Sequence, residues 1–196
     1  MVEKTTALGP GIRAAIWVQG CNLHCPGCIS PEWIPFKPAM QITPEEVIAR
    51  LPLDEITGLT FSGGEPMEQA GALAEVVHLA RQQRDLDIIC FTGYRYEALL
   101  EKPADTGIPS FLQVIDMLID GPYVSKKNTS VGLRGSENQR FIHLTDRLRS
   151  HSFENQVRKI EFKIDSGSLT MVGVPTPQIV SALKEILPEK RLEGTL

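Results

Sequence analysis

The sequence predicts an α/β fold, because short apolar runs alternate with segments that have helical spacing. Residues 12–19 are apolar at nearly every position, as in a strand that is covered on both faces. Residues 56–62 are rich in apolar and β-branched side chains, and residues 68–84 carry an apolar stripe at helical spacing. The first of these runs leads into a cysteine-rich loop, and ligands of open α/β sheets bind at the carboxyl ends of strands.

The first element is a polar lead-in over residues 1–10, which we expect to be loosely held. A capping box with proline at the first helical position, Thr43-Pro44-Glu45-Glu46, begins a helix that Pro52 ends. In chain order, the predicted elements are a strand over 12–19, this helix, a strand over 56–62, a helix over 68–84, a strand over 86–91, a short helix over 95–101, a loop over 102–110 and a fourth strand over 111–119.

The rest of the chain contains a long irregular segment and then an extension with its own pattern. Residues 121–140 have no strong period, and long irregular loops in compact domains are often functional. Residues 159–165 alternate strictly between polar and apolar, Ser166-Gly167 makes a turn and residues 169–172 return. This pattern predicts a β-hairpin with one solvent-facing side. Thr176-Pro177 then begins a final helix.

The composition is that of a globular protein, and we expect a single domain over residues 1–196. Hydrophobic residues make up 42% of the chain and charged residues 22%, and a chain of this length buries a core of its own. The net charge of −4 gives no basis for nucleic-acid binding, and no apolar run approaches membrane-spanning length. No signal peptide precedes the first cysteine, so we expect a reducing, cytoplasmic location.

Three cysteines, Cys21, Cys25 and Cys28, occur at positions i, i+4 and i+7. This spacing lets three thiolates converge on one centre, and thiolates are soft ligands that select iron–sulfur clusters, zinc or copper(I). A structural zinc site or a cubane cluster ordinarily has four protein ligands. If the centre is a [4Fe-4S] cluster, one iron is therefore left open to a small molecule.

Two other interpretations of these cysteines stay open at this point. A zinc site would need His24 or Cys90 as the fourth ligand, but His24 is very close in sequence to its neighbours. Cys90 lies near the end of the mainly apolar run Asp87-Ile88-Ile89-Cys90-Phe91, where a free cysteine is most simply a small core residue. A disulfide with spare thiols is disfavoured by the expected reducing location.

Polar residues that follow the later predicted strands are further candidates for a ligand site. In Ser62-Gly63-Gly64-Glu65-Pro66, two glycines let the backbone approach a ligand closely, and a carboxylate can accept hydrogen bonds from an ammonium group. The alternative is a tight turn that leads into a helix. Asp120 ends the fourth predicted strand. An arginine such as Arg134 in the following loop can bind a carboxylate through two hydrogen bonds, and the alternative, which the residues alone favour, is an ordinary surface arginine.

Several motifs in this order resemble the radical S-adenosylmethionine enzymes, and more specifically the anaerobic ribonucleotide reductase activating proteins, which are small glycyl-radical activases. The resemblance covers residues 9 to about 144. It rests on the CxxxCxxC loop after the first strand, on the GGE-type motif after the second, and on three later segments: Phe91-Thr92-Gly93-Tyr94, Leu118-Ile119-Asp120-Gly121-Pro122 and Leu133-Arg134-Gly135-Ser136-Glu137-Asn138-Gln139.

The resemblance implies a partial (β/α) barrel of the radical S-adenosylmethionine type over about 9–145, with the hairpin and helix as an extension over about 150–196. Cys21, Cys25 and Cys28 would ligate a [4Fe-4S] cluster. A further set of residues would bind S-adenosylmethionine: Gly27, Ser62, Gly63, Gly64, Glu65, Thr92, Tyr94, Asp120 and Arg134.

The reaction that the resemblance implies is reductive cleavage of S-adenosylmethionine to a 5′-deoxyadenosyl radical, which abstracts hydrogen from a glycine of a partner enzyme. An electron donor such as flavodoxin or ferredoxin would be needed. Two departures keep an alternative substrate open, a small molecule or a peptide: Ile29-Ser30-Pro31 replaces the usual polar residues, and the C-terminal extension is additional. A zinc-binding module without a reaction is a further alternative.

Overall fold

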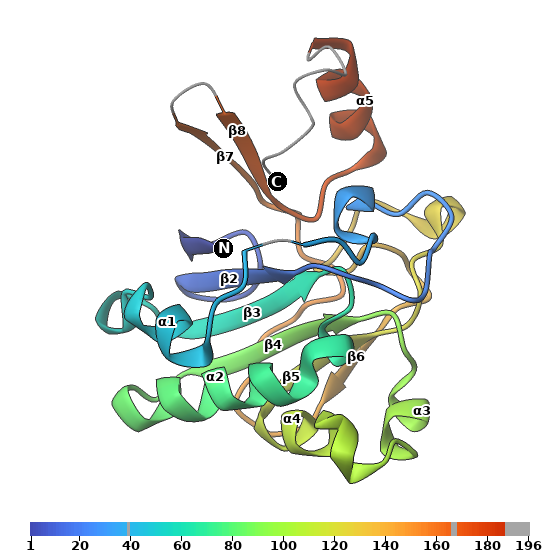
Figure 1. The fold of residues 1–196 in the computed structure, drawn as a ribbon. Coiled ribbons are helices and arrows are strands. Elements are labelled where there is room, and N and C mark those ends of the chain that lie inside the picture. The colour runs from blue at the N-terminus through green and yellow to red at the C-terminus, as the bar shows by residue number, and fades with distance from the viewer. Residues whose placement is uncertain (39, 166–167, 187–196) are drawn as a thin grey trace.

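The computed structural model describes residues 1–38, 40–165 and 168–186, and its elements form one larger and one smaller sheet (Figure 1). The strands are β1 (Val2–Thr5), β2 (Arg13–Val18), β3 (Gly58–Gly63), β4 (Asp87–Thr92), β5 (Met117–Asp120), β6 (Arg140–His143), β7 (Ile160–Asp165) and β8 (Ser168–Gly173). The α-helices are α1 (Pro44–Ala49), α2 (Ala70–Gln83), α3 (Tyr96–Leu100), α4 (Ile108–Val114) and α5 (Pro177–Ile186). Short 3-10 turns occur at Pro31–Trp33, Leu53–Glu55, Pro66–Gln69, Ala104–Thr106 and Ser125–Lys127.

The larger sheet has the order β1-β2-β3-β4-β5-β6 among the described strands, and its centre is parallel. Strands β2 to β5 pair in parallel, and β1 and β6 pair antiparallel at the two edges. This confirms the α/β class and the first three predicted strands, with boundaries shifted by one or two residues. A partial barrel stays a prediction.

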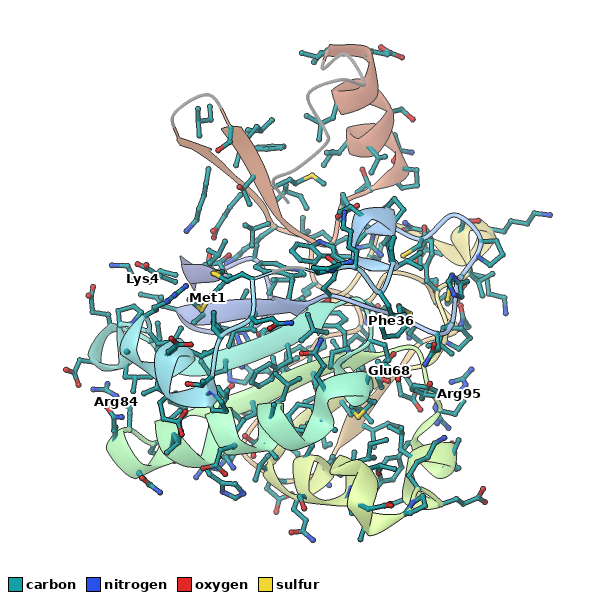
Figure 2. All side chains as sticks on the ribbon, viewed as in Figure 1. Met1, Lys4, Phe36, Glu68, Arg84 and Arg95 are labelled. Carbon is teal, nitrogen blue, oxygen red and sulfur yellow. The ribbon has the colours of Figure 1, made fainter. Side chains whose placement is uncertain are left out.

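One face of this sheet is covered by helices α1, α2 and α4, and side chains fill the layer between them (Figures 1 and 2). Alternate strand residues such as Ile16, Phe61 and Cys90 point into this core. Helix α1 begins as predicted. The Thr43 hydroxyl accepts a hydrogen bond from the Glu46 N–H (3.3 Å), and the Glu46 carboxylate accepts one from the Thr43 N–H (2.7 Å).

The opposite face of the sheet is covered mainly by irregular segments. Alternate strand residues such as Ala15 and Ile119 point to this side. They pack against the lead-in and against residues after the β5 strand, namely Ala7, Leu8, Leu133, Leu148, Phe153, Val172 and Val174. Loops rather than helices therefore border this face where the strands end.

The predicted strand over 111–119 is wrong, because its first part is helical. Helix α4 covers Ile108–Val114, and β5 begins only at Met117. The predicted loop over 102–110 is wrong at its last three residues, because they belong to helix α4. Ile108, Phe111 and Val114 are buried at helical spacing on α4, and a short apolar run does not by itself distinguish a helix from a strand.

The lead-in is also more ordered than predicted. Val2–Thr5 forms β1 against β2, and Leu8 is buried. The irregular segment over 121–140 is mostly loop as expected, but its last residue begins the edge strand β6, where Arg140 pairs with Asp120.

The predicted C-terminal hairpin and helix are present as β7, β8 and α5, and the hairpin's turn at 166–167 lies outside the described residues, as does Leu187. On strand β7 of the hairpin, polar side chains face the rest of the chain and apolar side chains face solvent. Glu161 accepts hydrogen bonds from the N–H and the hydroxyl of Thr6 (2.7 and 2.9 Å), so a polar side of β7 faces the lead-in. The apolar residues Phe162 and Ile164 are 48% and 81% exposed.

Arg13 at the start of β2 is a fully buried arginine that joins three strands. Its guanidinium forms an ion pair with Asp87 of β4 and donates to Thr60 Oγ1 and to the carbonyl oxygen of Leu59, both at 2.7 Å. No helix in the part of the chain that the structure describes is long and apolar enough to cross a membrane.

Candidate metal centre and cofactor pocket

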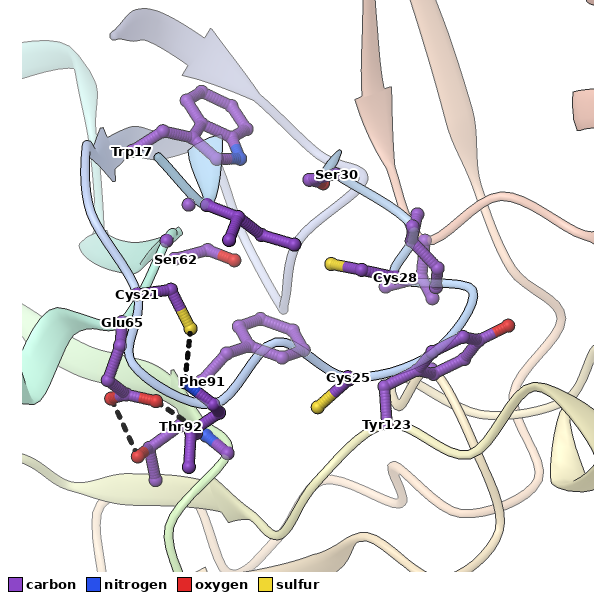
Figure 3. Close-up of a pocket in the computed structure, with 18 of the residues that line it drawn as sticks. Trp17, Cys21, Cys25, Cys28, Ser30, Ser62, Glu65, Phe91, Thr92 and Tyr123 are labelled. Carbon is purple, nitrogen blue, oxygen red and sulfur yellow. Dashed lines mark hydrogen bonds between the residues drawn. The ribbon is translucent and has the colours of Figure 1, made fainter. Parts of the chain in front are cut away.

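A cavity of about 150 Å³ lies where the parallel strands end, and all three clustered cysteines line it (Figure 3). The sulfur atoms of Cys21, Cys25 and Cys28 point into this space (Figure 3). Apolar side chains form much of the remaining wall, namely Leu8, Trp17, Leu23, Ile29, Ile34, Phe91 and Val174. The position at the carboxyl ends of β2, β3 and β4 is the one expected for a ligand of a parallel sheet.

The beginning of the cysteine loop is anchored to the backbone of the segment that follows the loop. The N–H groups of Gly20 and Cys21 donate to the carbonyl oxygens of Trp33 (2.9 Å) and Ile34 (3.0 Å). Burial raises the pKa of the Cys21 and Cys28 thiols in the metal-free chain. All three thiols are free, so the loop presents three potential soft ligands to one cavity.

Neither candidate for a fourth zinc ligand shares this cavity. Cys90 is fully buried in β4, where its thiol donates to the carbonyl oxygen of Phe91 (3.5 Å). His24 is exposed and is not among the lining residues. In the described ranges, no three His, Cys, Asp or Glu side chains are grouped closely enough to hold a single metal ion. The donor set of three thiols in a mostly apolar cavity fits an iron–sulfur cluster with three protein ligands.

Gly63 and Gly64 bring the turn after β3 against the cysteine loop. The N–H of Gly64 donates to the carbonyl oxygen of Val18 (2.7 Å). A Cβ at Gly63, where φ is +107°, would lie 2.5 Å from the Val18 backbone, and one at Gly64 would lie 2.2 Å from the Gly20 carbonyl oxygen. The absence of a Cβ at these two glycines therefore lets the turn after β3 pack closely against the backbone that leads into the cysteine loop.

Glu65 is a buried carboxylate that ties this turn to the end of β4. Its Oε1 accepts a hydrogen bond from the Met67 N–H (3.0 Å). Its Oε1 also accepts one from the Thr92 hydroxyl (2.8 Å), and its Oε2 accepts one from the Gly93 N–H (2.8 Å) (Figure 3). Burial raises the pKa of Glu65 to about 7, although the three donors act in the opposite direction.

The raised pKa of Glu65 predicts a pH-dependent stability. The folded chain holds a proton at Glu65 more tightly than the unfolded chain does, so the free energy of unfolding should fall as pH rises from about 4.5 to about 7. The full effect is on the order of 3 kcal/mol. Urea unfolding of the metal-free chain across this range would measure it, with Glu65→Gln as the comparison. If both proteins lose stability with the same slope, Glu65 does not titrate in this window.

The cavity brings together most of the predicted site residues. Besides the three cysteines, the predicted residues that line it are Ser62, Gly63, Gly64, Glu65 and Thr92. Gly27, Tyr94, Asp120 and Arg134 are not among the lining residues. The Tyr94 hydroxyl instead donates to Glu68 (2.8 Å).

Asp120 lies at the end of β5, as expected, but its carboxylate is occupied by other parts of the chain. It forms ion pairs with Arg140 and Arg95, and its Oδ2 accepts a hydrogen bond from the Tyr96 N–H (2.8 Å). The residue that reaches the cavity from this strand end is the next one, Gly121.

Arg134 lies beside the cavity wall, with its guanidinium over the Phe141 ring (5.5 Å to the ring centre). Gln139 and Gly135 of the same motif line the cavity instead. The Gln139 amide oxygen accepts hydrogen bonds from the Gly135 and Ser136 N–H groups (2.8 and 3.1 Å). Its amide nitrogen donates to the Gly121 carbonyl oxygen (2.9 Å), so this motif fixes two glycines at the cavity.

Sequence reasoning missed the apolar wall, of which Trp17, Phe91 and Val174 are examples. The only signal for Trp17 was its position near the end of a predicted strand. Phe91 is part of the segment Phe91-Thr92-Gly93-Tyr94, but it was not predicted as a site residue. Val174 follows the hairpin, more than 140 residues after the cysteines, and its local sequence contains no signal for this contact.

Comparisons with known proteins give a consistent result. A family described as a 4Fe-4S single cluster domain matches residues 7–142. An anaerobic ribonucleoside-triphosphate reductase-activating protein from Vibrio cholerae serotype O1 is 33% identical over 141 residues, which cover 67% of this chain and 87% of that protein. The protein of the same name from Enterobacteria phage T4 is 29% identical over 149 residues, or 73% of this chain and 91% of that protein. A pyruvate formate-lyase-activating enzyme from Clostridium pasteurianum is 34% identical over 94 residues, which cover 45% of this chain and 40% of that enzyme.

Proposed function

This chain is an enzyme of the radical S-adenosylmethionine activase family, which carries a 4Fe-4S single cluster domain, and on that premise we propose that it activates a glycyl-radical enzyme. The observation that carries the proposal is the convergence of three free thiols and the Gly63-Gly64-Glu65 turn on one cavity. When bound, the cluster and S-adenosylmethionine would supply a one-electron reduction that yields a 5′-deoxyadenosyl radical, and the cofactors rather than the protein carry this chemistry.

The roles that we propose for the residues follow from their positions. Cys21, Cys25 and Cys28 hold the cluster as thiolates, so loading it releases their protons. The backbone of Ser62 to Glu65 borders the methionyl part of S-adenosylmethionine. A carboxylate offers about four acceptor positions, and three at Glu65 are used within the chain, so one remains for the methionyl amine.

The other predicted residues divide into two groups. Thr92 lines the cavity and orients Glu65 through its hydroxyl. For Gly27, Tyr94, Asp120 and Arg134 we propose a supporting role, since none of these four is a lining residue. Gly135 and Gln139 are better placed than Arg134 to contact a bound cofactor.

The partner is proposed from the names of the relatives, which are activating proteins of anaerobic ribonucleoside-triphosphate reductase and of pyruvate formate-lyase. We propose a protein substrate of the same class, whose glycine loses hydrogen at this cavity. An electron donor of the flavodoxin or ferredoxin kind would supply the reducing electron. The apolar wall of the cavity would limit the access of water to the reacting atoms.

The test is an anaerobic experiment on the reconstituted protein. We expect dithionite reduction to give an EPR signal of a reduced cluster, a change in that signal when S-adenosylmethionine is added, and formation of 5′-deoxyadenosine. A glycyl-radical enzyme from the same organism should then acquire a glycyl EPR signal. Cleavage of S-adenosylmethionine without that signal would indicate another substrate, and a protein that binds zinc and leaves S-adenosylmethionine intact would exclude the proposal.

A further inference from the structure

One wall of the cavity comes from the C-terminal extension, outside the segment that the family matches. Gly173 ends β8, Val174 follows it, and both line the cavity that contains the three thiols. Val174 is only 8% exposed and belongs to an apolar cluster with Leu8, against which Ile29 packs. Because Ile29 directly follows Cys28 in the chain, the extension and the cysteine loop share one apolar cluster.

A single arginine, Arg158, connects this wall to the loop that contains Gly135. Arg158 Nη1 donates to the carbonyl oxygen of Pro175 (3.2 Å), next to Val174. Its Nη2 donates to the carbonyl oxygens of Arg134 and Gly135 (3.4 Å to Gly135), and Gly135 lines the cavity. The same guanidinium therefore holds two segments that each contribute to the cavity wall.

Further hydrogen bonds of Arg158 reach the same loop upstream, one of them from Nη2 to the Val131 carbonyl oxygen (3.5 Å). Its Nε donates to the Gly132 carbonyl oxygen (3.2 Å), and its Nη1 also donates to Asn128 Oδ1 (2.8 Å). Among the described residues, no ion pair joins Arg158 to a carboxylate. Arg158 therefore acts through the several N–H donors of its planar guanidinium, which bind neutral oxygen acceptors, and not through an ion pair.

We propose that Arg158 is a positioning residue that holds residues 173–175 against the loop over residues 128–135. The C-terminal extension thereby forms one wall of the cofactor pocket. The proposal rests on the proposed function only for the identity of what the pocket binds. The wall itself limits the access of solvent to the thiols and sets the shape of the space beside them.

The first test measures thiol access in the full-length, metal-free chain. Wild type, Arg158→Gln and Arg158→Lys would be labelled with N-ethylmaleimide, and each cysteine followed by mass spectrometry. We expect labelling of Cys25 and Cys28 to be about fivefold faster in both variants, because hydrogen bonds that hold the wall are lost and local opening becomes easier. Arg149→Gln, which removes an exposed arginine paired with Asp146, should label like wild type.

The buried Cys90 reports on global unfolding in the same experiment, since its side chain is fully enclosed in β4. We expect its labelling rate to be unchanged in every variant. If Cys90 labels faster together with the other thiols, Arg158 supports the whole fold and the proposal is overturned. If lysine restores the wild-type rate, a positive charge is sufficient, and the role of the several N–H donors is overturned.

The second test uses the reconstituted enzyme and separates binding from turnover. Arg158→Gln should raise KM for S-adenosylmethionine several-fold and leave kcat within about twofold, as for a residue that shapes a binding site. Val174→Ala leaves the contacts of Arg158 intact and should raise KM in the same direction by less. An unchanged KM in both variants would overturn the proposal. A wild-type protein that does not cleave S-adenosylmethionine would overturn the proposed function instead, and the labelling experiment would still test the wall.

Discussion

Alanine at Cys21, Cys25 or Cys28 is expected to remove the cluster and with it the cleavage of S-adenosylmethionine. Each thiol is one of only three lining the cavity among the described residues, so two cannot hold a cubane cluster in the same way. Iron content after reconstitution should fall from about four per chain to below about one. Formation of 5′-deoxyadenosine should fall by more than about 100-fold, because even residues that only orient a metal ligand contribute 10–100-fold.

The matched control is Cys90→Ala, which removes the remaining cysteine of the chain. Cys90 lies in the helix-covered core and not at the cavity, so this variant should keep its iron, its EPR signal and its activity. The substitution leaves only a small cavity in the core, so the free energy of unfolding should fall by roughly 1 kcal/mol. If Cys90→Ala loses the cluster and one of the other three variants keeps it, the assignment of the ligands is wrong.

Asp87→Asn is expected to destabilise the fold by about 3–5 kcal/mol, because it leaves the charge of a fully buried arginine without its counter-charge. Arg13 joins β2, β3 and β4, so the loss affects the centre of the sheet. Urea unfolding of the metal-free chain at pH 7 would measure the change. The double variant with Arg13→Met should recover part of the loss, since it also removes the unpaired charge.

A surface pair provides the control for this second prediction. Asp54 lies 3.8 Å from Arg84, and both side chains are well exposed. Asp54→Asn should therefore change the free energy of unfolding by less than about 0.5 kcal/mol. A loss at Asp87→Asn no larger than that at Asp54→Asn would show that the buried pair contributes little to stability.

The cysteine loop and the glycine turn could be located from the sequence because their chemistry depends on local spacing. Three cysteines within a single loop are close in space whatever the rest of the chain does, and Gly63-Gly64 directly follows a recognisable strand. The first three strands of the larger sheet's parallel centre also followed from short apolar runs, but the run over 111–119 did not, because a buried face of three apolar residues suits a helix as well as a strand.

The partners of charged residues could not be found in the same way. Asp120 was correctly placed at a strand end, but only the antiparallel pairing of β5 with β6 brings Arg140 beside it. Arg13 interrupts an apolar strand, and nothing local shows that Asp87 lies two strands away. The wall formed by Val174 depends on contacts between distant parts of the chain and was equally inaccessible.

The distance along the chain between the thiols and this wall has a consequence for synthesis. At the usual 5–20 residues per second, Cys28 is made roughly 7–30 s before Val174. The parallel strands and the covering helices on the other face all precede the wall in the chain. The parallel strands that carry the cysteine loop can therefore fold before residues 173–175 close one side of the cavity. In that interval the path of iron and sulfide to the thiols is wider than after residues 173–175 have been made.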